Sequence, residues 1–176
     1  MMNRLVTRLQ YHEHRMFCFV NQQIRHQALD FFFNIITHLG GAAASIATAL
    51  CIALFAEGVW KSAGMLSCVA LGLSHVPVAI IKKKYPRLRP YLVLEGTHTC
   101  KKPLKDHSFP SGHTTAIFSV TVPMMLITPW VTAILLPVAS LVGMSRIYLG
   151  LHYPSDVLAG LLIGTTTALT TVAFLG

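Results

Sequence analysis

Long apolar stretches separated by short polar ones dominate the chain, and their lengths predict membrane-spanning helices. Residues 35–56, 62–81 and 157–175 are each close to the roughly 20 residues that a helix needs to cross a bilayer. A further apolar stretch, 112–147, is too long for one span. Thr128-Pro129-Trp130 divides it into two, because proline lacks an amide donor and tryptophan favours the membrane interface. The pattern therefore predicts five spans.

The first 34 residues alternate between polar and apolar positions, which is typical of an amphipathic helix lying in the membrane interface. Apolar residues fall near one helical face, with Arg4, Arg8 and Arg15 elsewhere. A sixth, stunted span over 16–34 is the alternative, but it would bury several polar side chains: Asn21, Gln22, Gln23, Arg25 and His26. We therefore expect an interfacial segment, 1–34, followed by a membrane domain, 35–176.

Composition supports this assignment to the membrane. Hydrophobic residues make up 53% of the 176-residue chain and charged residues only 11%, whereas soluble domains carry roughly a quarter charged residues. The predicted fold is an all-α, multi-pass helical bundle in the cell membrane. The net charge of +8 is compatible with binding to anionic lipid headgroups, with a phosphate substrate or with topology signals. The positions of the basic residues along the chain must distinguish these explanations. Nucleic acid is not an expected partner.

Three polar motifs interrupt the apolar pattern. The first is the basic run 82–90, in which Lys82 and Arg89 are candidate anion ligands. For Lys83, Lys84 and Arg87, charges that merely orient the chain in the membrane are the better interpretation.

The second motif, Pro110-Ser111-Gly112-His113, opens the third predicted span. Ser111 is a candidate N-cap, and the free backbone N–H groups of such a helix start also bind anions.

The third motif is Ser145-Arg146, then His152, then Asp156. A carboxylate four residues beyond a histidine can accept its ring N–H and leave the other nitrogen nucleophilic. Asp156 can also simply favour a helix N-terminus. By contrast, His38 and His75 lie inside apolar stretches, where a hydrogen bond between helices is the expected role.

Counting spans shows that all three motifs open on the same membrane face. The first two share the loop between spans two and three, and the third lies between spans four and five. Three cations, a helix N-terminus and two histidines can thus converge, which predicts a phosphate site. Because the sequence lacks a carboxylate cluster for Mg²⁺, we expect metal-free chemistry without a cofactor.

The ordered pattern Lys-x6-Arg-Pro, Pro-Ser-Gly-His and Ser-Arg-x5-His-x3-Asp resembles the signature of the type 2 phosphatidic acid phosphatases and their vanadium haloperoxidase relatives. The resemblance implies that His152 attacks phosphorus and that Asp156 fixes its tautomer. It implies that His113 protonates the leaving group and then activates water. Phosphate oxygens would be held by five residues: Lys82, Arg89, Ser111, Gly112 and Arg146. That family usually has six core helices, whereas in this sequence the first of them is reduced to an interfacial or very short segment.

The resemblance implies a lipid phosphate or diphosphate as substrate, with phosphatidylglycerophosphate, phosphatidate and undecaprenyl diphosphate as candidates. A vanadate haloperoxidase is a second class, but those relatives are soluble. A phosphate-binding or transport protein is a third, although it needs the cations and not both histidines. Lys61 alone among 14 Lys and Arg falls on the opposite face, so the positive-inside rule favours a cytoplasmic site. Family members that recycle undecaprenyl diphosphate work outside.

Overall fold

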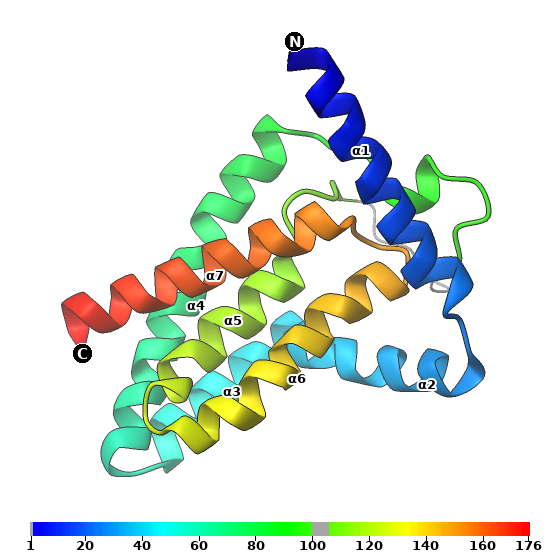
Figure 1. Ribbon diagram of the computed structural model, residues 1–176. Helices are drawn as coiled ribbons and strands as arrows, with labels where there is room; N and C mark the ends of the chain where they lie inside the picture. The colour runs from blue at the N-terminus through cyan, green and yellow to red at the C-terminus, as the bar shows by residue number, and fades with distance from the viewer. Residues whose placement is uncertain (1, 100–105) are drawn as a thin grey trace.

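The computed structural model describes residues 2–99 and 106–176, and the regular structure within those ranges is helical throughout (Figure 1). The main helices are, in chain order, α1 (Met2–Cys18), α2 (Gln27–Ile36), α3 (Ala42–Phe55), α4 (Gly58–Lys84), α5 (Gly112–Met125), α6 (Pro129–Tyr148) and α7 (Pro154–Leu175). Three short helical turns join them: η1 (Phe19–Gln23), η2 (Thr37–Gly40) and η3 (Pro90–Leu92). The predicted all-α class is confirmed.

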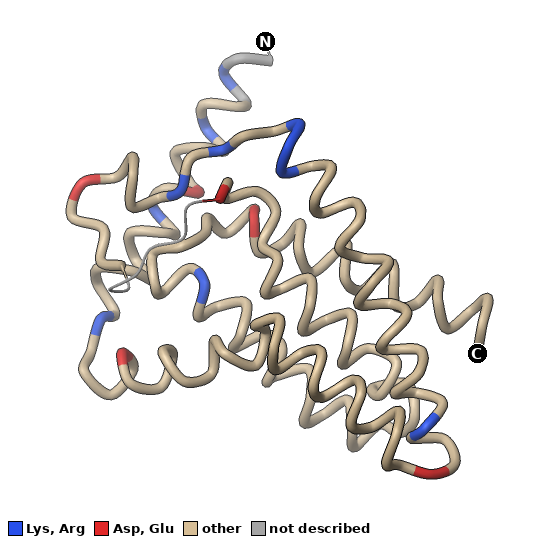
Figure 2. The backbone as a smooth tube through the Cα atoms, turned by 180° about the vertical axis from the view of Figure 1, so that it is seen from behind, with Lys and Arg blue, Asp and Glu red and all other residues tan. Residues whose placement is uncertain are grey.

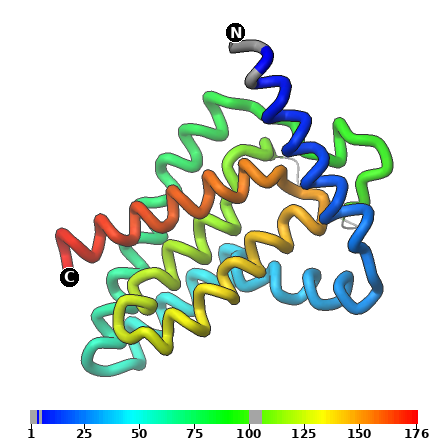
Figure 3. The backbone as a smooth tube through the Cα atoms, viewed as in Figure 1, coloured from blue at the N-terminus to red at the C-terminus, as the bar shows by residue number. Residues whose placement is uncertain are grey.

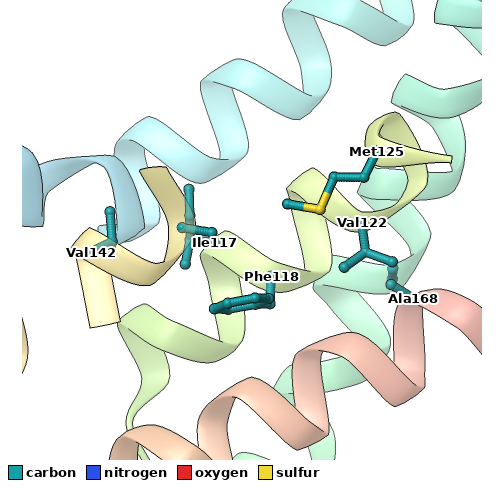
Figure 4. Packing of buried hydrophobic residues seen from close by; sticks show 8 residues of the cluster. Ile117, Phe118, Val122, Met125, Val142 and Ala168 are labelled. Atoms are coloured by element: carbon teal, nitrogen blue, oxygen red, sulfur yellow. The ribbon is translucent and has the colours of Figure 1, made fainter. Parts of the chain in front are cut away.

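Helix α5 lies at the centre of the bundle and packs against α4, α6 and α7. Every residue from Thr114 to Met125 is buried, so this helix has no face turned outward. Figure 4 shows part of the apolar core around it, where Ile117, Phe118 and Val122 meet Val142 of α6 and Ala168 of α7. The helix that begins with the second motif is therefore held from all sides.

Two glycines let α7 approach α5 closely. A Cβ atom at Gly160 would lie 2.6 Å from the carbonyl oxygen of Ser111, and one at Gly164 would lie 2.6 Å from that of Thr115. Small residues at such positions allow two helices to approach closely. The contact sets the depth of Ser111, at the start of α5, relative to the first turns of α7.

The apolar stretch 35–56, predicted as one continuous span, is broken. It comprises the end of α2, the turn η2 and α3, and the two helical parts meet at an angle of 55°. Gly41 at the break is extended, with φ −73° and ψ 153°. Gly40 lies so close to α5 that an added Cβ would be 2.7 Å from the carbonyl oxygen of His113. The break therefore places Gly40 and Gly41 directly against the start of α5.

Helix length and composition account for three or four of the five predicted spans among the described residues. Among the described residues, α4, α6 and α7 are long and apolar enough to cross a membrane, and the bent pair around η2 makes a fourth if it counts as one span. Helix α5 has 14 residues, which gives a length of about 21 Å. The protein is a multi-pass membrane protein, and five remains the predicted count. The break between α5 and α6 lies at Thr128-Pro129, as expected.

The N-terminal segment is helical and is anchored to the bundle by a buried side chain. Asn21 donates to the carbonyl oxygens of Tyr148 (2.7 Å) and His98 (2.8 Å), and accepts from the His98 amide (2.9 Å). These bonds satisfy a polar group that would be costly in a membrane span. Figure 3 shows α1 running past the beginning of α7. The division at residue 34 remains a prediction.

Candidate active site

The three polar motifs meet at one end of the bundle, as counting the spans predicted. Lys82 lies in the last turn of α4, His113 in the first turn of α5, Arg146 in the last turn of α6, and Asp156 in the first turn of α7. A cavity of about 670 Å³ opens there. Five predicted site residues line it: Lys82, Arg89, Gly112, His113 and His152.

His152 is buried in the loop between α6 and α7 and is held from both ring nitrogens. Its Nε2 lies 3.2 Å from Nη1 of Arg89, and its Nδ1 lies 3.6 Å from Oδ2 of Asp156. A guanidinium can only donate, so Nε2 is the acceptor and carries no proton. The proton is then on Nδ1, facing the carboxylate. This is the tautomer that the i, i+4 spacing predicted.

Burial lowers the pKa of His152 to about 4, and the charges of Arg146 and Arg89 act in the same direction against the opposing effect of Asp156. Near neutral pH the imidazole is therefore uncharged, which a nucleophile requires. Its Nε2 is the nitrogen next to the cation Arg89, and His152 lines the cavity. A phosphate held by Arg89 would thus lie beside a basic nitrogen.

Asp156 is fully buried and has four partners. Its Oδ2 accepts from the backbone N–H of Tyr153 (2.8 Å) and from the hydroxyl of Ser108 in a short hydrogen bond. Its Oδ1 accepts from Nη1 of Arg87 (2.8 Å). These bonds fix the carboxylate against His152. The helix-start interpretation of Asp156 also holds, because the bond from Tyr153 caps the first turn of α7.

Arg89 is 1% exposed and is held on three sides. Nη1 donates to the carbonyl oxygen of Leu151 (2.7 Å), Nε to the carbonyl oxygen of Asp106 (2.8 Å), and Nη2 to Oδ1 of Asp106 (2.7 Å). Lys82 pairs with the other carboxylate oxygen of Asp106. Burial opposes ionisation of this carboxyl, but bonds and charges from Lys82 and Arg89 lower the pKa of Asp106 to about 2.

The two remaining predicted ligands, Ser111 and Arg146, are not among the residues that line the cavity. Ser111 is fully buried and is the N-cap of α5, accepting from the Thr114 amide (3.4 Å) and hydroxyl (2.9 Å). Arg146 is buried, and its Nη1 donates to the hydroxyl of Thr37 in η2 (2.7 Å). A Cβ atom at Gly41 would lie 3.7 Å from Nε2 of His113, so the break before α3 lies directly beside this histidine.

Four residues near the site were not singled out from the sequence, and a fifth, Arg87, makes contacts that its predicted topology role does not require. Three of them contact predicted site residues directly, across separations of 17 to 109 positions: Ser108, Asp106 and Thr37. The fourth, Glu13, contacts Arg87. Arg87 was interpreted as a topology charge, but it pairs with Asp156 and with Glu13. Its position two residues before Arg89 was the one available signal. Lys83 and Lys84 are exposed, as a topology role implies.

The cavity continues from the polar end into an apolar groove between α3, α4 and α5. Its walls there include Ile46, Leu50, Cys68 and Leu71. His75 also lines it, and its Nδ1 bonds to the carbonyl oxygen of Leu71 (2.9 Å) in the same helix, not to another helix as expected. Among the described residues, no group of three or more His, Cys, Asp or Glu side chains is placed to hold a metal ion.

A solved structure shares this arrangement of helices, and curated relatives share part of the sequence. A crystal structure of LpxE from Aquifex aeolicus superposes with a TM-score of 0.82 at 30% identity, covering 91% of this chain and 94% of that one. An undecaprenyl-diphosphatase of Sulfolobus acidocaldarius is 30% identical over 60% of this chain and 52% of its own length. A lipid A 1-phosphatase of Rhizobium etli is 41% identical over 60% of this chain and 46% of its own.

The chain thus spans about half the length of these two curated relatives. The family match itself extends over residues 63–176, which contain all three motifs and helices α5 to α7, together with most of α4. On the strength of that match, the chain belongs to the PAP2 superfamily.

Proposed function

We propose that this chain is a phosphatase that hydrolyses a phosphomonoester or diphosphate of a membrane lipid through a phosphohistidine intermediate on His152. The observation that carries the proposal is the pairing of His152. Its Nε2 faces Arg89 at the cavity, and its Nδ1–H is turned to a buried carboxylate. A phosphate-binding protein needs the cation but not an oriented neutral imidazole beside it.

In the first step, the lone pair on Nε2 of His152 forms a bond to phosphorus, and the bond from phosphorus to the leaving oxygen breaks. Bound substrate brings negative charge beside His113, which favours its protonated form, and this histidine then gives its proton to that oxygen. Asp156 stabilises the imidazolium charge that develops on His152. Lys82, Arg89 and Arg146, with Ser111 and the Gly112 amide, hold the oxygens of the phosphoryl group as charge shifts onto them.

In the second step, water attacks the phosphorus of the phosphohistidine, and the bond between phosphorus and nitrogen breaks. His113, now neutral, takes a proton from that water and is ready for another cycle. Inorganic phosphate leaves with the oxygen of the water. No residue in this sequence of steps requires a metal ion, so we expect turnover in the presence of a chelator.

The lipid tail would lie in the apolar groove between α3, α4 and α5, which begins where the polar site ends. This placement requires the protein to be embedded in the membrane that holds the substrate, and we assign it to the cell membrane. We take 35–176 as the phosphatase domain. Relatives named for undecaprenyl diphosphate and for lipid A keep both diphosphates and phosphomonoesters among the candidate substrates.

The test is phosphate release from a panel of lipids in detergent with EDTA present: phosphatidylglycerophosphate, phosphatidate, undecaprenyl diphosphate and a phosphorylated lipid A. Wild type should release phosphate from at least one of them, and His152→Ala should release none. His12→Ala is the matched control, because His12 is an exposed histidine of α1, and it should behave as wild type. Turnover by His152→Ala, or a strict need for Mg²⁺, would contradict the proposal.

A further inference from the structure

Helix α1 lies against the loop that carries His152. The Tyr153 ring stacks on His14 with 5.7 Å between the ring centres, and Phe17 lies 5.8 Å from the same ring. Glu13, on the same stretch of α1, accepts from the backbone N–H of Ser155 (3.1 Å) and from its hydroxyl in a short hydrogen bond. A helix outside the family match therefore covers the start of α7.

Arg87 connects this helix to the buried carboxylate. Its Nη2 lies 2.6 Å from Oε2 of Glu13, and its Nη1 lies 2.8 Å from Oδ1 of Asp156. The guanidinium also stacks on the Tyr153 ring, with Cζ 3.9 Å from the ring centre. Arg87 donates as well to the hydroxyl of Ser155 (2.7 Å). Its plane is thus fixed by partners from α1 and from α7.

We infer that Glu13 and Arg87 are positioning residues for Asp156, and that α1 is part of the catalytic apparatus. The inference rests on the proposed function. Arg87 holds Oδ1, which turns Oδ2 toward Nδ1 of His152. Without this bond, a carboxylate held only through Oδ2 can rotate about its own axis.

Glu13 has a second effect, through charge. Arg87 alone would neutralise Asp156 and weaken its attraction for the imidazolium that forms on His152. With Glu13 bound on the far side of the guanidinium, the three groups together carry one negative charge. The Glu13 side chain is 13% exposed and that of Asp156 0%, so solvent screens this arrangement only in part. The triplet therefore favours the charged transition state without touching the substrate.

The decisive variant is Glu13→Gln, because an amide oxygen can still accept from the Ser155 amide while the charge is lost. We expect kcat to fall about 10-fold, as the loss of an orienting partner does in metal sites, with KM unchanged within about twofold. Glu57→Gln, the same substitution at an exposed position in the α3–α4 turn, should leave both constants unchanged. Thermal unfolding in detergent confirms that each variant is folded.

A double-substitution cycle separates positioning from a purely structural role. In an Arg87→Gln background, adding Glu13→Gln should lower kcat hardly any further, because the effect of Glu13 passes through the guanidinium of Arg87. Independent losses in the two backgrounds would overturn the inference, as would an unchanged kcat or a rise in KM alone. If Glu13→Gln does not fold, Arg87→Lys decides in its place. Lysine keeps the positive charge but lacks the two guanidinium nitrogens that bond Glu13 and Asp156 at the same time. An unchanged kcat in this variant would contradict the inference. Absent turnover in wild type would instead refute the proposed function.

Discussion

Asp156 is the residue on which the contacts of the site meet. It accepts hydrogen bonds from Ser108, Tyr153 and Arg87 and faces His152, and its own side chain is fully buried. An ionised carboxylate is tolerated at such a buried point only when hydrogen bonds and a cation compensate for lost hydration. The same bonds determine which nitrogen of His152 carries the proton and which has the lone pair. At the residue scale, the site is thus a buried charge used to orient a neutral base.

The protonation of His152 is the first prediction at this scale. With a pKa of about 4, the ring is neutral above that pH and gains a proton as the pH falls through it. An unperturbed histidine would do so near 6.5. We expect the imidazole signals of His152 in an NMR titration, assigned by difference from His152→Gln, to move with a midpoint close to 4. A midpoint near 6.5 would mean that the nucleophile is not desolvated as the structure indicates.

Asp106 provides the second prediction. Its carboxylate offsets one of the two positive charges of Lys82 and Arg89, the cations proposed to bind phosphate. Asp106→Asn should therefore strengthen anion binding and lower KM by about twofold to fivefold, the range expected for a partly exposed ion pair. Initial rates over a range of substrate concentrations test this, with Glu95→Gln, an exposed loop carboxylate, as the control. An unchanged or raised KM would show that Asp106 arranges the two cations and does not compete for them.

Much of the site was predictable because its residues lie in short motifs at helix ends. His113, Arg146, His152 and Asp156 are brought together by the alternation of the spans, which hydrophobicity reveals. The partners Glu13, Thr37 and Ser108 were not predictable. Each meets its site residue across a long stretch of chain, and glutamate, threonine and serine are common enough to give no local signal. For Arg87, surrounding lysines made a simple topology role the more economical interpretation.

At the scale of elements, helix ends carry the chemistry and glycines set their distances. Hydropathy predicted where apolar helices lie, including the break at Thr128-Pro129. It missed the break at Gly40-Gly41, because two glycines do not interrupt an apolar average. That break matters, since it places η2 and α3 beside His113 and gives Arg146 its contact with Thr37. Close packing, not hydrophobicity, decides such bends.

Packing of α7 on α5 gives the prediction at this scale. Gly160→Ala would place a methyl group 2.6 Å from the Ser111 carbonyl oxygen and 3.1 Å from Cβ of Thr114. We expect a loss of about 1–3 kcal/mol in stability, the usual cost of overpacking, measured by thermal unfolding in detergent. Gly72→Ala is the matched control, because nothing lies within 4 Å of its added Cβ. Equal stability of the two variants would contradict the tight α5–α7 contact.

For the whole molecule, the uneven distribution of charge is the main feature. Figure 2 shows Lys and Arg gathered toward the end of the bundle that holds the site. Lys61 lies in the first turn of α4, at the opposite end of that helix from Lys82. Counting the predicted spans along the sequence assigns 13 of the 14 Lys and Arg to the site face. The positive-inside rule therefore predicts a cytoplasmic site. That location suits a lipid made on the inner leaflet, such as phosphatidylglycerophosphate.

Cysteine labelling in intact cells tests this orientation. A single cysteine near Thr97, in the loop on the site face, should be protected from an impermeant reagent, whereas one replacing Lys61 should react. The two positions act as controls for each other, since they lie at opposite ends of the bundle. The reverse pattern would place the site on the outer face of the membrane and contradict the predicted orientation.

The central claim is a covalent phosphohistidine on His152, and trapping it is the most direct measurement. Wild type is mixed with a lipid substrate carrying labelled phosphate, quenched in alkali within one turnover and digested for mass spectrometry. We predict label on the peptide that contains His152, stable to alkali and lost in acid, and no label on His152→Ala. Label on another residue, or full turnover with no labelled protein in a single-turnover experiment, would contradict the account.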